Sequence, residues 1–302
     1  AAAGVRGAAE EDGRARGAGS ASGREVVVAR YDEDLAWLKN YSVEGVVFKV
    51  YNKGNATEGV ASEQLPNVGR EGHTYLHHIV EHYDDLADWT VFTQGSAPHW
   101  GFAKDTTGHL PDYVGFEDFV SGRGSRQDSF MPVTSVRHLP SGIGSWRLGL
   151  RFKEFRNKSS TICPADGFLG WSDWYFDQFA LKKITGQRML NFYFDEVAQI
   201  PRAGHETVTL GYSQGARFSV SRARIRSRPV QYYQALMSHL SREKDPIEGY
   251  WLETMWYDVF HPGNLQAFST LCAYPVAPEG RPSVPEKVMR ANARRRLSGL
   301  GV

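Results

Sequence analysis

Short apolar runs alternate with segments of helical spacing over the first third of the chain. Residues 25–30, 46–51 and 89–93 form largely apolar runs, and each is followed by polar residues or glycine. Runs of this length are typical of strands that are buried on both faces of a parallel sheet. Residues 32–40 and 72–83 lie between the runs and carry apolar side chains at helical spacing. The order strand, helix, strand, helix, strand implies right-handed crossovers and predicts an α/β fold with a mainly parallel sheet flanked by helices.

The second half of the chain adds further helical segments and one more strand. We expect helices at residues 172–184, 229–240 and 249–260, and a strand at residues 216–220. Residues 96–161 are rich in Gly, Ser and Arg and have few periodic segments, so we expect long loops over the sheet. Loops of that length are often functional.

The two ends of the chain differ in composition from its centre. Residues 1–24 consist mostly of Ala, Gly, Arg and Ser, and cannot bury enough apolar surface to offset the entropy of ordering. We expect them to form a disordered stem or linker. Residues 277–302 contain three prolines and the basic run 294–296, which indicates an exposed tail, with a docking role as the alternative to a solvated one. Residues 25–276 are then expected to form a single domain.

Charge and hydropathy restrict the class of partner. The chain has 35 basic and 34 acidic side chains and a net charge of +1, which gives no general attraction to nucleic acid or to a membrane surface. No apolar run reaches the roughly 18 residues that cross a bilayer. Because the sequence begins with Ala1 rather than Met, we expect that a signal or anchor has been removed, and that any membrane attachment depends on that missing segment.

Three Asn-x-Ser/Thr sequons, at Asn40, Asn55 and Asn157, exceed the about one that chance would give. Acceptor sequons matter only for a chain that enters the secretory pathway. The excess therefore favours the Golgi lumen or the extracellular space. Cys163 and Cys272 lack the spacing of a zinc or redox motif, and they either pair across the fold or are buried thiols.

Polar residues follow each of the first three predicted strands. They are residues 30–32 after the first strand, 52–54 after the second and 94–95 after the third. Ligands of parallel α/β sheets bind beyond the carboxyl ends of the strands. We therefore expect a binding site formed by Arg30, Tyr31, Asn52, Lys53, Gly54, Gln94 and Gly95.

Residues 78–82, His-Ile-Val-Glu-His, match the inverted zincin pattern. Helical spacing argues against a zinc site, because it predicts a buried face formed by Leu76, Ile79, Val80 and Tyr83. At about 100° per residue, His78 and His82 then fall on the opposite face, toward solvent. A hydrolytic zinc needs a water-restricted cavity, so a zinc-dependent hydrolase is the last of the alternatives.

Residues 211–222 hold a Gly-rich turn that enters a strand. The small residues beside Gln214 and Gly215 would let the backbone approach a ligand, and a purely structural turn is the alternative. Further along, Glu253 flanks the apolar stripe of the 249–260 segment, beside aromatic side chains. Partial desolvation would raise the proton affinity of this carboxylate and suit a general base, whereas capping or pairing with an Arg is the structural alternative.

Two further groups have candidate roles. His261 follows the last predicted helix, where it either reaches a metal or a phosphate or caps the helix end. Asp173 lies with Asp166 and Asp177 among two Trp residues, an arrangement that suits sugar hydroxyls and ring faces. Asp173 and Asp177 are also four residues apart on one predicted helix, so a structural role is equally consistent.

Several segments resemble a known family, the domain of unknown function 3431. The matching segments span nearly the whole predicted domain and are residues 28–38, 50–54, 65–76, 91–95, 215–221 and 253–256. The family name implies no activity.

The order of these features is also similar to that of GT-A glycosyltransferases, whose Rossmann-related single domain binds a nucleotide-sugar donor and a glycan or protein acceptor. That resemblance implies that Glu253 deprotonates the acceptor hydroxyl and that Gln94 and Gly95 contact the donor sugar. The nucleotide diphosphate would be held by Arg30, Asn52, Lys53 and Arg70.

The place of the GT-A metal motif departs from the family pattern. It is normally Asp-x-Asp, and residues 94–96 here read Gln-Gly-Ser. Mn²⁺ or Mg²⁺ on a diphosphate requires hard oxygen ligands. Either Arg70 neutralises the phosphates instead, or a divalent metal is held by His99, Asp105 and His261. If there is no such donor, the chain is a non-catalytic carbohydrate- or nucleotide-binding domain of the same fold.

Overall fold

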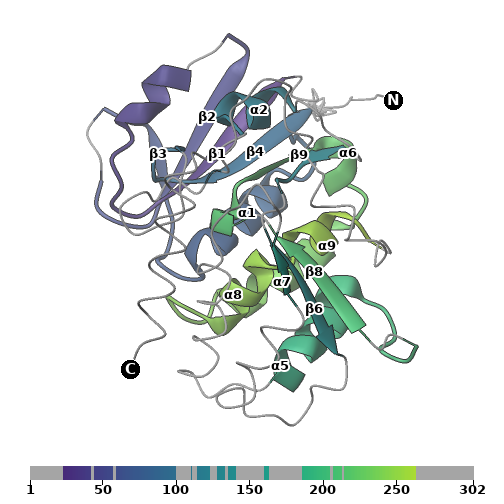
Figure 1. Cartoon of the computed structure of the whole chain (residues 1–302). Helices are drawn as coiled ribbons and strands as arrows, with labels where there is room; N and C mark the ends of the chain where they lie inside the picture. Colours follow the sequence, from purple (N-terminus) through teal and green to yellow (C-terminus); the bar gives the residue numbers. More distant parts are fainter. Residues whose placement is uncertain are drawn as a thin grey trace, which may run out of the picture.

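A mixed, mainly parallel sheet forms the centre of the molecule (Figure 1). The computed structural model of the chain describes residues 23–41, 44–56, 59–99, 110, 114–122, 128–132, 135–140, 160–162, 186–204, 207–212 and 214–262. The sheet has six strands in the order β3-β2-β1-β4-β9-β5. In chain order they are β1 (Arg24–Arg30), β2 (Val46–Asn52), β3 (Ser62–Gln64), β4 (Trp89–Gln94), β5 (Ser129–Phe130) and β9 (Phe218–Ser221).

The strand register brings three carboxyl ends to one edge. β1 is parallel to both of its neighbours, with Arg30 opposite Asn52 on β2 and Ala29 opposite Gln94 on β4. β9 is antiparallel to β4, where Phe92 faces Phe218. The predicted α/β fold with a mainly parallel sheet is therefore confirmed. β2 and β4 lie on opposite sides of β1, so a topological switch point, the usual place for a ligand in such sheets, occurs at β1.

Both faces of the sheet are covered, as the apolar strands predicted. On β1, Val27 and Ala29 point into one buried cluster, and Val26 and Val28 point into the other. The first cluster is formed with α1 (Arg70–Glu81), α6 (Arg222–Ile225), α7 (Val230–Leu240), α8 (Ile247–Glu253) and α9 (Trp256–Phe260). The second is formed with the 3-10 helix η1 (Ala36–Tyr41) and with α2 (Phe116–Ser121).

A small antiparallel sheet lies below the central sheet in the view of Figure 1. Its strand order is β7-β6-β8, with β6 (Ser135–Pro140), β7 (Ser160–Ile162) and β8 (Thr207–Tyr212). α5 (Gly186–Asn191) continues into a π-helix, η2 (Phe192–Ala198), and the 3-10 turn η3 (Gln214–Ala216) leads into β9.

The expectation of loops throughout residues 96–161 is wrong where these residues are described, because they include α2, β5, β6 and the start of β7. These elements are two to six residues long, too short to give a periodic signal.

The predicted helices are found with changed boundaries. The helix expected at 72–83 is α1, and the helix expected at 229–240 is α7. Residues 249–260 were expected to form one helix, but α8 ends at Glu253 and α9 begins at Trp256. The expected helix at 172–184, both cysteines and most of the two predicted tails lie outside the described residues. In the part of the chain that the structure describes, no helix has the length and apolar character needed to span a bilayer.

Candidate ligand-binding pocket

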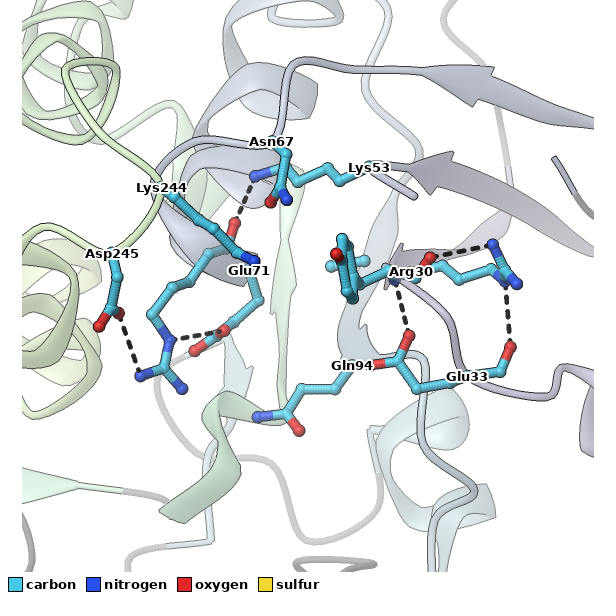
Figure 2. Close-up of a pocket in the computed structure, with 11 residues that line it drawn as sticks. Arg30, Glu33, Lys53, Asn67, Glu71, Gln94, Lys244 and Asp245 are labelled. Atoms are coloured by element: carbon cyan, nitrogen blue, oxygen red, sulfur yellow. Dashed lines mark hydrogen bonds and ion pairs between the residues drawn. The ribbon is translucent and has the colours of Figure 1, made fainter. Parts of the chain in front are cut away.

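A cavity of about 370 Å³ lies where the carboxyl ends of β1, β2 and β4 meet the amino end of α1 (Figure 2). Five of the residues expected at a binding site line it: Arg30, Tyr31, Lys53, Arg70 and Gln94. The wall is completed by Ala29, Glu33, Asn67, Glu71, Lys244 and Asp245. Lys244 and Asp245 come from the loop between α7 and α8, so the cavity is closed by two parts of the chain far apart in sequence.

Arg30 holds together the loops that follow β1 and β2. Its side chain is 9% exposed, and Nε donates to the backbone oxygen of Glu33 at 3.0 Å. Nη1 donates to Asn52 Oδ1 at 2.7 Å and to the backbone oxygen of Asn55 at 2.8 Å. These contacts commit much of the guanidinium to the protein itself. Arg30 and Asn52 therefore shape the pocket edge, and the phosphate contacts expected of them stay a prediction.

Gly54 and Gly95 also support the pocket from outside its lining. A Cβ on Gly54 would overlap the backbone oxygen of Tyr31, so only glycine lets the two loops approach this closely. The backbone oxygen of Gly95 accepts a hydrogen bond from Trp37 Nε1 at 2.8 Å. A Cβ there would lie 2.7 Å from Glu33 Oε2. Both glycines thus serve the packing of the strand-end loops.

Tyr31 presents an aromatic ring to the cavity. Glu33 Oε2 accepts the backbone N–H groups of Tyr31 at 2.7 Å and Asp32 at 3.2 Å, which fixes the loop backbone. The Tyr31 residue is 43% exposed, although it is a large aromatic. The ammonium of Lys244 lies 4.9 Å from the ring centroid, a cation–π distance.

Lys53 is the most buried cation of the pocket wall. It is 8% exposed, and Nζ donates to the backbone oxygens of Val68, at 2.6 Å, and Arg70. Among the described residues, no carboxylate lies within ion-pair distance of it. Burial lowers the pKa of Lys53 to about 8, although the charge of Glu71 opposes part of this change. Lys53 is therefore still mainly protonated at pH 7, in a place where a ligand anion would stabilise its charge.

The first turn of α1 is fixed against the end of α7. Gly69 and Arg70 both have a left-handed backbone, with φ of 62° and 51°. A Cβ on Gly69 would lie 2.5 Å from the backbone oxygen of Leu240. The Gly69 N–H donates to the backbone oxygen of Glu243 at 3.0 Å. Backbone strain held in this way is a feature of ligand sites, and the amino end of α1 adds partial positive charge to the cavity.

Arg70 joins α1 to the loop between α7 and α8. Its guanidinium lies 3.6 Å from Glu71, 3.7 Å from Asp245 and 4.4 Å from the ring centroid of Tyr250. The pocket wall therefore holds four cationic side chains, from Arg30, Lys53, Arg70 and Lys244, against three carboxylates. One of those carboxylates, Glu33, already accepts two backbone N–H groups. This excess of cationic over anionic side chains suits an anionic ligand, and charged N–H donors are effective partners for phosphate oxygens.

Two of the three residues expected to hold a metal, His99 and His261, are described by the structure. His99 Nδ1 lies 2.9 Å from the backbone oxygen of Ala97. His261 closes α9, where Nδ1 donates to the backbone oxygen of Tyr257 at 2.7 Å and Nε2 lies 2.9 Å from Ser129 Oγ. Asp105 and Asp173 lie outside the described residues. Within the described ranges, no three His, Cys, Asp or Glu side chains form a group that could hold a metal ion, and the expected site with Asp105 stays a prediction.

The expected solvent exposure of His78 is wrong. His78 is 0% exposed, with Tyr51 OH 2.9 Å from Nδ1 and Glu25 Oε1 3.0 Å from Nε2. α1 packs against the sheet and also against α7, so more than one of its faces is buried. Both ring nitrogens of His78 are engaged within the protein. His82 is partly exposed beside Lys49 and Asp85, and its ring centroid lies 4.8 Å from that of His78.

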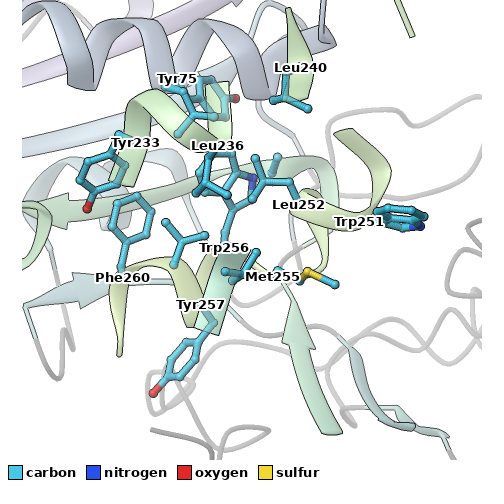
Figure 3. Packing of buried hydrophobic residues seen from close by; sticks show 14 of the residues in the cluster. Tyr75, Tyr233, Leu236, Leu240, Trp251, Leu252, Met255, Trp256, Tyr257 and Phe260 are labelled. Carbon is cyan, nitrogen blue, oxygen red and sulfur yellow. The ribbon is translucent and has the colours of Figure 1, made fainter. Parts of the chain in front are cut away.

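Glu253 is buried and does not belong to the cavity lining. It is 4% exposed, and its Oε1 accepts the backbone N–H of Gly215 at 3.1 Å. Gly215 has φ of 76°, so the carboxylate fastens a left-handed turn at the entry to β9. Figure 3 shows the neighbouring side chains of α8 and α9, including Leu252 and Trp256, packed in the same buried cluster. Gly215 therefore makes the structural turn that was the alternative to a ligand contact.

Sequence reasoning missed Glu33, Asn67, Glu71, Lys244 and Asp245. Glu33, Asn67 and Glu71 lie inside the segments that carry the family resemblance, so a local signal was present. Lys244 and Asp245 belong to the charged run 242–245 between two predicted helices. Such a run is usually a solvated loop, and only the packing of α1 against α7 places it over the strand ends.

The fold and the pocket define an α/β domain with a basic, aromatic-walled cavity at its topological switch point. A family described as protein of unknown function (DUF3431) matches residues 26–110 and 151–273. The chain belongs to this family. No curated protein and no solved structure matches the chain.

Proposed function

We propose that this chain binds a nucleotide-sugar donor in the cavity and transfers the sugar to a glycan or protein acceptor. The observation that supports this proposal is the combination of cations and an exposed aromatic ring at the carboxyl ends of β1, β2 and β4. Lys53, Arg70 and Lys244 suit a diphosphate, and the ring of Tyr31 suits a planar base. Neither inorganic phosphate nor a plain sugar would use both features.

The proposed reaction is a glycosyl transfer in which an acceptor hydroxyl attacks the anomeric carbon. The bond from that carbon to the phosphate oxygen breaks, the nucleoside diphosphate leaves, and a base accepts the hydroxyl proton. Charge develops on the leaving diphosphate, and preorganised cations at that place stabilise it. Lys53 and Arg70, which are held by contacts with Val68 and Asp245, are the cations that we assign to this role.

The first experiment is a thermal-shift screen with UDP-, GDP- and CMP-linked sugars, each with Mn²⁺ and with EDTA. We expect the sugars of one nucleotide to raise the Tm, and the increase to persist in EDTA because protein cations neutralise the phosphates. A ligand at 100 times its Kd would stabilise the fold by about 2.7 kcal/mol, enough to shift the Tm by several degrees. If no nucleotide sugar raises the Tm, the proposal is wrong.

Glu253 is the base that the sequence predicts, and Glu253→Gln tests it. Glutamine retains an oxygen that can accept the Gly215 N–H, so the turn at η3 should be preserved. We expect unchanged donor binding and a transfer rate lower by about 10²- to 10⁴-fold. Full activity in the variant would limit Glu253 to supporting the turn.

A binding domain without catalysis is the second candidate function, and the position of Glu253 outside the cavity lining favours it. This candidate predicts the same thermal shift as the first. It predicts no release of nucleoside diphosphate from the stabilising donor, with water or with any acceptor. Turnover by the wild-type protein that Glu253→Gln or Lys53→Met abolishes would exclude it.

A further inference from the structure

Lys244 and Tyr31 line the cavity from distant parts of the chain and contact each other. Lys244 lies on the loop between α7 and α8, and Tyr31 lies on the loop after β1. The ammonium is 4.9 Å from the ring centroid, and both residues are exposed. Among the described residues, no carboxylate lies within ion-pair distance of the Lys244 ammonium. The ring face of Tyr31 is thus the partner that this cation has in the pocket without a ligand.

The backbones on either side of this pair are fixed, whereas the contact itself is exposed. Glu243 accepts the Gly69 N–H at 3.0 Å. Asp245 pairs with Arg70 at 3.7 Å and accepts the hydroxyl of Tyr250 at 2.9 Å. An exposed cation–π contact is weak, so a ligand can replace it at small cost. The long Lys244 side chain can then turn toward the cavity without movement of its loop.

We propose that Lys244 and Tyr31 form an exchangeable pair that makes the pocket select ligands that carry both a planar ring and an anionic group. The base of the ligand stacks on Tyr31 in place of the ammonium, and the ammonium moves to the phosphate. A ligand that has only a planar ring displaces the ammonium from Tyr31 and offers Lys244 no anionic group to contact instead. An anion alone leaves the ring uncovered. This inference rests on the proposed nucleotide binding and assigns the selection for a nucleotide to two named residues.

Titrations of the whole chain with nucleosides and their diphosphates test the pair. The ligands are UDP, GDP, ADP and CDP, each beside its parent nucleoside, and pyrophosphate. Calorimetry measures the diphosphates, and ligand-observed NMR measures the weakly bound nucleosides. The variants are Lys244→Met and Tyr31→Leu, and Lys39→Met is the matched control because Lys39 is an exposed lysine outside the cavity lining. The variants change exposed side chains, and their Tm values confirm that they fold.

The expected effects of Lys244→Met have opposite signs. Affinity for the nucleoside diphosphate that binds the wild type should fall by about 5- to 10-fold, because a charged donor to phosphate is lost. Affinity for its parent nucleoside should rise by about 2- to 5-fold, because the base no longer displaces an ammonium. Tyr31→Leu should weaken both by at least about 5-fold, as loss of a stacking surface does, and should leave pyrophosphate binding undiminished.

Each outcome of this test is decisive. Nucleoside affinity that falls or stays constant in Lys244→Met overturns the exchangeable pair, and the proposed donor site remains if the diphosphate still binds the wild type. Binding of none of the diphosphates to the wild type overturns both proposals. Opposite shifts without any sugar transfer support the pair and refute only the transfer reaction. Lys39→Met must bind as the wild type does.

Discussion

At the residue scale, two cations at neighbouring strand ends have different tasks. Arg30 ends β1, and its guanidinium donates hydrogen bonds to oxygens of Glu33, Asn52 and Asn55. Lys53 follows β2, and among the residues that the structure describes its ammonium is held by the backbone oxygens of Val68 and Arg70. Sequence alone placed both at the site, because polar residues after parallel strands collect at one edge. Sequence could not show that Arg30 supports the loops whereas Lys53 faces the proposed ligand. That difference depends on which loop oxygens the fold brings to each side chain.

Lys53 should make the proposed anion binding dependent on pH. Its pKa is lowered to about 8 by burial, so the ammonium is lost from the free pocket as the pH rises through that value. We expect nucleoside diphosphate affinity to decline above pH 8 in the wild type. In Lys53→Met, affinity at pH 7 should be lower by about 10-fold, as for loss of a charged hydrogen bond, and should change little between pH 7 and 9.

Calorimetry from pH 6.5 to 9.5 measures this dependence. Phosphate groups are fully ionised over most of that range, since their second pKa is about 6, so the ligand itself adds little slope above pH 7. Lys39→Met is the control and should follow the wild-type curve. An equal decline in the wild type and in Lys53→Met would show that the titrating group is not Lys53.

At the element scale, the pocket depends on how closely the loops after β1 and β2 approach each other. Gly54 lies against the backbone oxygen of Tyr31, with no space for a Cβ. Gly54→Ala must therefore separate the loops. We expect a loss of about 1–3 kcal/mol in the free energy of unfolding, as for other overpacked sites, together with weaker nucleotide binding because Tyr31 is displaced. Urea denaturation and calorimetry measure the two effects.

Gly249 provides the matched control for that substitution. It lies in α8, and a Cβ there would meet its nearest neighbours at 3.9 Å, an ordinary contact. Gly249→Ala should be neutral or should stabilise the helix by about 0.5–1 kcal/mol. If Gly54→Ala is as stable as Gly249→Ala and binds nucleotides normally, the close approach of the two loops is not required.

Sequence predicted the elements that carry a strong local pattern and missed those set by tertiary packing. β1, β2 and β4 were predicted because each contains a run of mostly apolar residues, as is typical of strands in a covered parallel sheet. The break between α8 and α9 was not predicted, because residues 249–260 are buried on nearly all sides and no polar face marks the end of a helix. The burial of His78 was missed for a related reason. Its hydrogen bonds to Tyr51 and Glu25 replace solvent inside a polar interior site that hydrophobic spacing does not encode.

At the scale of the whole molecule, several ionisable groups are buried, and they make the free energy of unfolding depend on pH in opposite directions. Burial raises the pKa of Asp258 from 3.8 to about 7, and the hydrogen bond from Tyr193 and the charge of Arg228 offset only part of that increase. Burial lowers the pKa of His73 from 6.5 to about 4, and the charges of Lys53 and His77 lower it further. Both groups are thus held neutral by the fold near pH 6. The sign of the pH dependence that each contributes is nevertheless different.

Asp258 and His73 should give opposite slopes in one pH window. Between pH 4 and 7 the folded state holds a proton on Asp258 that the unfolded chain has lost. The contribution of Asp258 to the free energy of unfolding therefore falls as the pH rises. Between pH 4 and 6.5 the unfolded chain protonates His73 and the folded state does not, so that contribution rises with pH. One proton changes the free energy of unfolding by about 1.4 kcal/mol per pH unit at most.

Urea denaturation of Asp258→Asn and His73→Gln from pH 4.5 to 7.5 separates the two contributions. The free energy of unfolding of the wild type minus that of Asp258→Asn should decrease with pH across this range. The corresponding difference for His73→Gln should increase up to about pH 6.5 and then level off. Each difference cancels the titration of Glu25, His78 and every other group common to both proteins, so its slope reports one side chain. A flat difference for Asp258→Asn would mean that the buried carboxyl keeps its ordinary pKa, and that Arg228 and Tyr193 stabilise its ionised form.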